Sequence, residues 1–111
     1  MMSKTGQVLL IATAFLGAAA ITMQAADATA GKAIYDKKCK TCHGPEGQGN
    51  PGMAKALNVE FKPFSGMDVQ KMSDADLKKV IMMGSGKMKP VAGLSDGDAG
   101  DAVAFLRTLK K

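Results

Sequence analysis

Both cysteines of the chain and its single histidine lie within five consecutive residues. They form the pattern Cys39-x-x-Cys42-His43, inside the stretch KKCKTCHGPEGQG that spans 37–49. Three kinds of chemistry use residues of these types at this spacing. The thiols can form a redox-active disulfide, the thiols and imidazole can bind zinc, or the thiols can attach a haem whose iron the imidazole then ligates. The function of the protein depends on which of the three applies.

The haem interpretation gives all three residues a task. A redox Cys-x-x-Cys pair is typical of a strand-helix-strand unit, which the sequence does not show, and it leaves His43 without a role. Structural zinc requires four nitrogen or sulfur ligands, and the chain has no other Cys or His. Two thiols near a helix end can each add to a haem vinyl group, with His43 as the proximal iron ligand. We therefore favour covalent haem attachment over the disulfide and the zinc site.

The iron of such a haem needs a second axial ligand, and methionine is the available donor because no second histidine exists. Met88 lies in the loop GSGKMKPVAG at 84–93. Glycines on both sides and the rigid Pro90 let the backbone approach a flat macrocycle closely, while the flanking lysines stay in water. We predict Met88 as the sixth ligand, with Met83 and Met67 as alternatives. Core filling is the ordinary role of a methionine.

The N-terminal segment has the order of a secretory signal. A short basic start is followed by the apolar run VLLIATAFLGAAAITM at 8–23 and then by small residues. This run is shorter than the roughly 20 residues of a membrane span, so an uncleaved anchor is the alternative. We expect residues 1–25 to be a signal peptide, cleaved after Ala25 or Ala26. Residues 26–111 then form one domain in the periplasm.

The expected mature chain is modestly basic. Without Lys4 it keeps 14 basic and 10 acidic residues, a net charge of about +4. The charge is too small, and too free of interleaved aromatic residues, to indicate nucleic-acid binding. It fits docking onto an acidic redox protein or a membrane redox complex. We predict that Lys40, Lys87 and Lys89 line the docking edge, although they could equally serve only to solubilise it.

Helical patterns occur at three places, and no strand pattern is convincing. The expected helices run from Asp27 or Thr29 to Lys40, from Ser73 to Gly84, and from Ser95 to the C-terminal end. Long stretches rich in glycine and proline separate them, with one short helical turn at 54–57. Such stretches need something to pack against, which a cofactor would provide.

The chain resembles a small bacterial class I monohaem cytochrome c. The residues that carry the resemblance are Gly31 and Tyr35, the Cys39–His43 motif, GQGNPGM at 47–53, Met88 before Pro90, and Phe105 and Leu106 near the C-terminus. The family usually has Met followed directly by Pro, whereas here Lys89 intervenes. The resemblance implies an all-α cytochrome c fold, with three main helices and long loops wrapped around one covalently bound haem.

The same resemblance implies roles for further residues. The first and last helices are expected to cross at Gly31. A proline carbonyl, that of Pro51 or alternatively Pro45, would accept the second N–H of His43. The residues expected to keep the iron dry are Leu57, Val59, Phe64, Ile81 and Val91.

The function implied is that of a soluble, monomeric electron carrier rather than an enzyme. Ligation by His43 and Met88 leaves no open iron position for a substrate, and thioether ligation raises the reduction potential. If Met88 does not ligate, the alternative is an open-site haem protein, either a gas sensor or a peroxidase-like protein.

Overall fold

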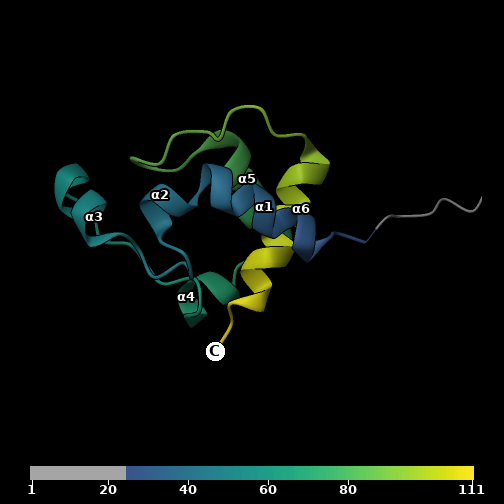
Figure 1. Ribbon diagram of the computed structural model, residues 1–111, viewed down its shortest axis with the longest axis horizontal. Coiled ribbons are helices and arrows are strands. Elements are labelled where there is room, and N and C mark those ends of the chain that lie inside the picture. The colour runs from purple at the N-terminus through teal and green to yellow at the C-terminus, as the bar shows by residue number, and fades with distance from the viewer. Residues whose placement is uncertain (1–24) are drawn as a thin grey trace, which may run out of the picture.

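The computed structural model describes residues 25–111, which fold into helices joined by long loops (Figure 1). The expected signal peptide falls almost wholly outside this range. The described residues contain no strand and only an isolated bridge between Ser85 and Met88, so the all-α fold class is confirmed. The helices are α1 (Ala28–Lys38), α2 (Lys40–His43), α3 (Pro51–Leu57), α4 (Met67–Gln70), α5 (Asp74–Met83) and α6 (Asp96–Thr108).

The three longest helices, α1, α5 and α6, are the three main helices expected, and their ends follow local side-chain chemistry. The Asp27 carboxylate accepts backbone N–H groups of the first turn of α1. The Ser73 hydroxyl does the same for α5, and Ser95 forms a complete capping box with Asp98 at α6. Gly84 ends α5 with a φ of 79°, in a region that favours glycine.

The first helix is shorter than predicted, because the chain breaks at Cys39. α1 ends at Lys38, and Cys39 has a φ of −117°, far from the value of about −63° in a regular helix. Its N–H still donates to the Tyr35 carbonyl, at 2.9 Å, and α2 then starts at Lys40.

Two short helices interrupt the stretch between α2 and α5. The Asn50 side chain accepts the N–H groups of Gly52 and Met53, and Pro51 occupies the first helical position, where its missing N–H costs nothing. These features start α3 three residues before the helical turn predicted at 54–57. Helix α4 was not predicted, since four residues are too few to show a helical period.

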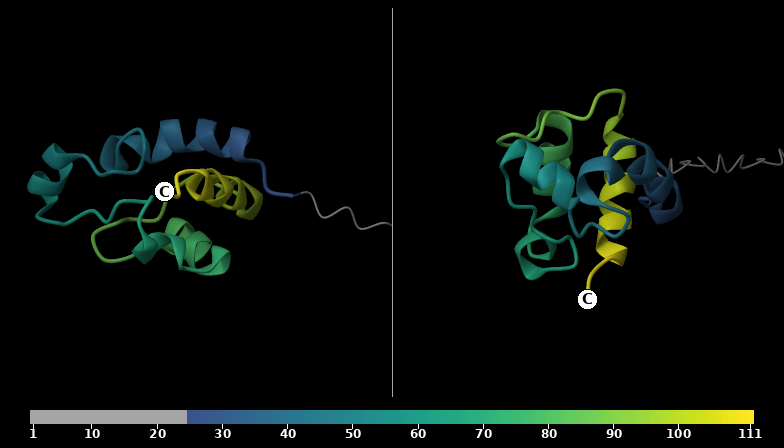
Figure 2. Two further views of the ribbon diagram at one scale, coloured as in Figure 1. Left: turned by 90° about the horizontal axis from the view of Figure 1, so that it is seen from below. Right: turned by 60° about the vertical axis from the view of Figure 1, so that its left-hand side comes forward.

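Helices α1 and α6 cross in close contact (Figure 2). Gly31 lies at the crossing, and a Cβ atom there would clash with the backbone carbonyl of Asp101. The Asp101 carboxylate also accepts the N–H of Asp27, at 2.8 Å. Gly31 therefore lets the two backbones approach each other, as predicted.

The core lies where α6 meets α1 and α5. One cluster of buried side chains surrounds Tyr35, Phe105 and Leu106, and another includes Leu77, Ile81, Ala99 and Val103. Arg107 joins α6 to the segment that contains α4 and the start of α5. Its guanidinium contacts the Asp74 carboxylate at 2.8 Å and the carbonyls of Gln70 and Met72, an arrangement that we call the Arg107 clamp.

Candidate functional site

Cys39, Cys42 and His43 line one cavity of about 720 Å³. This volume falls within the roughly 300–1,000 Å³ typical of ligand pockets. The lining is mainly apolar and comes from segments spread between residues 38 and 106. It includes all five residues that the sequence predicted for the pocket: Leu57, Val59, Phe64, Ile81 and Val91.

Backbone hydrogen bonds hold the cysteine–histidine motif in place. The His43 N–H donates to the Cys39 carbonyl at 3.0 Å, and the His43 carbonyl accepts the N–H of Gly49 at 2.7 Å. Asn50 donates its backbone N–H to the Cys42 carbonyl and its side-chain amide to the Thr41 carbonyl. The loop after α2 thus folds back on the motif and fixes its position at the cavity wall.

The His43 ring lies between two aromatic rings. Its centroid is 4.6 Å from that of Phe64 and 5.2 Å from that of Phe61. Burial lowers the pKa of His43, which favours the neutral imidazole that a metal ion requires. Its Nδ1 is buried and has no hydrogen-bond partner among the described residues. A buried unpaired ring nitrogen is costly in a purely structural histidine, so this atom marks His43 as functional.

The two thiols are free and only partly exposed. Burial and the neighbouring Cys42 raise the pKa of the Cys39 thiol to about 11. Redox-active cysteines instead have a lowered pKa, which supplies the reactive thiolate. The described residues also hold no group of three or more Cys, His, Asp or Glu side chains that could hold a metal ion. Neither the disulfide nor the zinc alternative gains support from this geometry.

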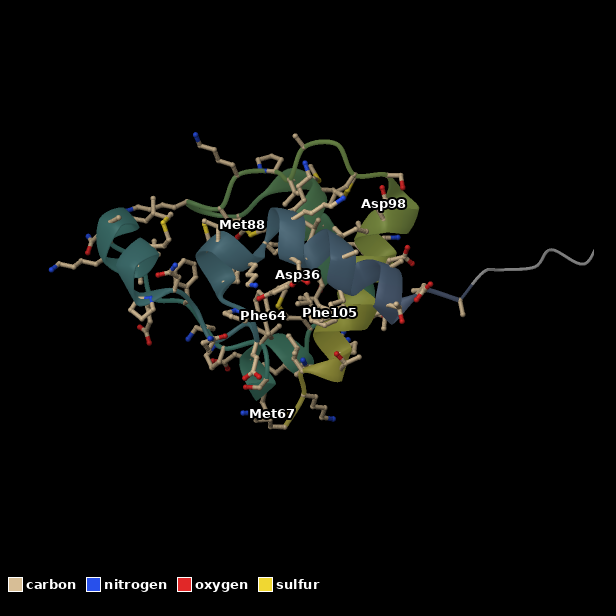
Figure 3. All side chains as sticks on the ribbon, in the orientation of Figure 1. Asp36, Phe64, Met67, Met88, Asp98 and Phe105 are labelled. Atoms are coloured by element: carbon tan, nitrogen blue, oxygen red, sulfur yellow. The ribbon has the colours of Figure 1, made fainter. Side chains whose placement is uncertain are left out.

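Met88 lines the same cavity, on a sharply turned loop (Figure 3). Ser85 and Met88 exchange two backbone hydrogen bonds of 2.9 Å, which close a two-residue turn at Gly86 and Lys87. Gly86 has a φ of 56°, as such turns require of their first residue. The Val91 N–H donates to the Ile81 carbonyl and ties the base of the loop to α5. We call residues 84–91 the methionine loop.

The other methionines differ in position. Met67 and Met83, the two alternatives for the sixth ligand, are 63% and 66% exposed and do not line the cavity. In the view of Figure 3, Met67 lies at the lower edge of the molecule, well below Met88. Met72 does line the cavity, which sequence reasoning did not single out, because its place depends on the Arg107 clamp.

Neither candidate proline lines the cavity. Pro45 and Pro51 both border a second hollow, of about 420 Å³, together with Asp36 and Lys40. No carbonyl of the described residues accepts a hydrogen bond from His43 Nδ1. The role of Pro51 or Pro45 as partner of that nitrogen stays a prediction.

The predicted docking lysines are divided between the two hollows. Lys87 and Lys89 line the cavity, whereas Lys40 borders the second hollow. Lys38 lines the cavity as well, and no sequence pattern had singled it out. Lys87 also donates to the Leu57 carbonyl at 2.6 Å, a bond between two parts of the cavity rim.

The donors present fit a covalently bound haem. Two thiols and an imidazole lie at one wall, a thioether belongs to another, and the rest of the lining is largely hydrocarbon. In the described part of the chain, the long loops pack around this cavity and do not form a separate hydrophobic core. No helix among residues 25–111 is long and apolar enough to cross a bilayer.

Comparisons with known proteins agree with this site. The family model described as cytochrome c oxidase, cbb3-type, subunit III matches residues 26–106. Cytochrome c-554(547) of Halothiobacillus neapolitanus is 39% identical over an alignment of 91 residues, which covers 78% of this chain and all of that protein. The solved structure of the c-type cytochrome KustC0563 superposes with a TM-score of 0.63 at 28% identity, covering 73% of this chain and 98% of that one.

A helical fold around an apolar cavity with a Cys-x-x-Cys-His motif at its wall defines a c-type cytochrome. The chain belongs to the family described as cytochrome c oxidase, cbb3-type, subunit III, whose model matches it. It is a small bacterial c-type cytochrome. Members of this class carry electrons on a covalently bound haem c, whose iron is the redox centre.

Proposed function

We propose that the protein is a soluble one-electron carrier with a single haem c, ligated by His43 and Met88, that moves electrons between redox complexes outside the cytoplasm. One observation carries this proposal: Cys39, Cys42, His43 and Met88 all line the same apolar cavity. The single Cys-x-x-Cys-His motif supports one haem rather than several.

The cysteines of the cavity and its two iron-binding residues would have separate roles. When bound, the haem supplies a one-electron couple at its iron. Cys39 and Cys42 would hold the group through two thioether bonds, so that it cannot leave during turnover. His43 and Met88 would both ligate the iron and leave it no open position for a substrate. Thioether ligation, unlike a second imidazole, favours a raised reduction potential.

The walls of the cavity would limit the rearrangement of solvent when the iron gains or loses an electron. Leu77, Ile81 and Val69 are buried and belong to both the core and the cavity lining. They come from α4 and α5, pack against buried residues of α6 and cannot move aside without opening the core. A dry and rigid surrounding leaves little solvent and few side chains to rearrange when one electron is added or removed, as a carrier requires.

Lysines at the cavity would guide partners. Lys38, Lys87 and Lys89 are exposed and line the cavity, so positive charge gathers where an electron would leave. An acidic partner would be drawn to this rim by long-range attraction. The expected signal peptide, if it directs export, would put this encounter in the periplasm.

Replacement of Met88 tests the ligation. In the matured wild-type protein we expect a haem-stained band on a denaturing gel, together with the far-red absorption that accompanies iron–thioether bonding in the oxidised state. Met88→Ala should retain the stain, lose the far-red band and bind carbon monoxide rapidly when reduced. Met83→Ala, which removes a thioether outside the cavity, is the control and should behave like wild type. A far-red band that survives Met88→Ala, or one that is absent from wild type, would overturn the His43/Met88 assignment.

A further inference from the structure

The methionine loop is held at its base by main-chain bonds and at its tip by one side chain. The base is fixed to α5 by the bond from Val91 N–H to the Ile81 carbonyl. At the tip, Lys87 reaches away from the loop and donates to the carbonyl of Leu57, the last residue of α3. This is the only side-chain hydrogen bond between loop and α3 among residues 25–111. Figure 1 shows the loop after α5 extending toward α3.

The Leu57 carbonyl is well suited to accept this bond. A helix leaves its last carbonyls without intrahelical partners, and lysine side chains commonly satisfy them. Asn58 ends α3 in the left-handed region, with a φ of 52°, and its N–H turns back to Ala54 and Lys55. The carbonyl of Leu57 is therefore left to other donors. At 2.6 Å the Lys87 bond is short, as expected for a charged donor.

The elements joined by this bond have little else to hold them together. Helix α3 contributes no buried residue, so no core packing fixes its place. Apart from α2, it makes no extensive contact with another helix of the described residues. In Figures 1 and 2 it lies at one end of the molecule, away from the crossing of α1 and α6. The Lys87 bond thus closes a rim that packing leaves open.

Lys87 and Met88 are adjacent residues of one closed turn, so their positions are coupled. The paired hydrogen bonds between Ser85 and Met88 make the turn a rigid unit. If the Lys87 side chain is anchored on α3, the turn cannot swing outward, and Met88 keeps its place at the cavity. We infer that Lys87 is a positioning residue, whose bond to the end of α3 holds the methionine loop closed and Met88 toward the iron. This inference rests on the proposed ligation by Met88.

Lys89 provides a matched control. It lies on the other side of Met88, lines the same cavity and carries the same charge, and it makes no hydrogen bond or ion pair among the described residues. Lys87→Ala and Lys89→Ala therefore remove equal charge from the same rim, but only the first removes the bond to Leu57. Lys87→Arg keeps both charge and donor and should restore the behaviour of wild type.

Displacement of the thioether by added imidazole measures how firmly the loop is closed. We expect Lys87→Ala, in the haem-loaded protein, to bind imidazole about threefold to tenfold more tightly than wild type, because opening no longer breaks a hydrogen bond to a charged donor. Lys89→Ala should stay within about twofold of wild type. Equal effects of the two alanine variants would show that only charge matters and would overturn the inference.

Hydrogen exchange provides a second measurement that does not depend on the iron ligand. Amide exchange at 51–57 and 86–88 should accelerate in Lys87→Ala and remain unchanged in Lys89→Ala. If wild type lacks the far-red band, the proposed ligation fails, yet exchange still shows whether the two segments are joined. If wild type has the band and exchange is equal in both variants, the ligation stands and the role of Lys87 is refuted.

Discussion

At the scale of single residues, Tyr35 links the first helix to the motif. It is 1% exposed, and its hydroxyl donates to the Gly44 carbonyl at 2.5 Å, directly after α2. Its ring packs against Phe105 with centroids 5.0 Å apart. Burial raises the pKa of Tyr35 to about 12, because an ionised phenolate would lose its hydration there. The phenol therefore fixes the C-terminal end of α2, next to His43, as long as it keeps its proton.

Stability should fall in alkaline solution through this residue. Above pH 10 the tyrosine of the unfolded chain releases its proton, whereas the folded protein holds the proton until about pH 12. The unfolded state then binds fewer protons than the folded state, so the free energy of unfolding decreases as pH rises through this window. Tyr35 is the only tyrosine in the chain, so ultraviolet titration of the phenol reports it alone.

Tyr35→Phe tests this linkage. The variant should lose about 1 kcal/mol of stability at neutral pH, because the Gly44 carbonyl loses its donor. Its decline in stability between pH 10 and 12 should also be shallower than that of wild type. Denaturant melts of the two haem-loaded proteins at several pH values provide the comparison. Parallel declines would mean that other groups control the alkaline loss.

Some site residues could be predicted from the sequence and others could not, for a physical reason. Cys39, Cys42 and His43 are neighbours in the chain, and Met88 has a loop context that points to close approach. Met72 and Lys38 reach the cavity only because distant segments pack together. Likewise, the partner of Lys87 lies 30 residues away, at a helix end that no local pattern marks as its acceptor.

At the scale of elements, the crossing of α1 and α6 depends on Gly31, because only a residue without a side chain fits at this contact. Gly31→Ala should destabilise the haem-loaded protein by at least about 1–3 kcal/mol, because its methyl group would meet the Asp101 backbone, which cannot rotate away. Gly100→Ala, on α6, is the control. A Cβ there meets nothing within 4 Å, so higher helix propensity should make this variant about 0.5–1 kcal/mol more stable. Thermal denaturation measures both. A Gly31→Ala protein as stable as wild type would show that the helices can separate at no cost.

Helix ends were predictable where side chains cap them, as at Asp27, Ser73 and Ser95. The break at Cys39 was not, since the lysines on both sides of it carry no breaking signal. It depends on how the loop at 49–50 bonds back to α2, a contact between separate segments. Helix α2, which carries Cys42 and His43, was thus not predicted as a separate helix.

At the scale of the whole molecule, the chain encloses a cavity rather than a continuous core. Fully buried side chains gather at the crossing of α1, α5 and α6, and α3 contributes none. A domain of this size buries little apolar surface, so a bound cofactor would supply contacts that the polypeptide lacks. The low aromatic content, 5% of the residues, indicates the same deficit in the sequence.

The charge distribution gives the last prediction. Lys38 and Lys89 line the cavity, whereas Lys110 is an exposed lysine of the C-terminal end outside it. If the rim steers acidic partners, the second-order rate of electron transfer to an acidic redox protein should fall as salt rises, because the Debye length shortens to about 10 Å at 0.1 M. At low salt, Lys38→Gln and Lys89→Gln should each slow the reaction by about twofold to fivefold, and Lys110→Gln by much less. Stopped-flow measurements across ionic strengths test this directly. If all three variants slow the reaction equally, net charge rather than the rim attracts the partner, and if salt has no effect, steering is absent.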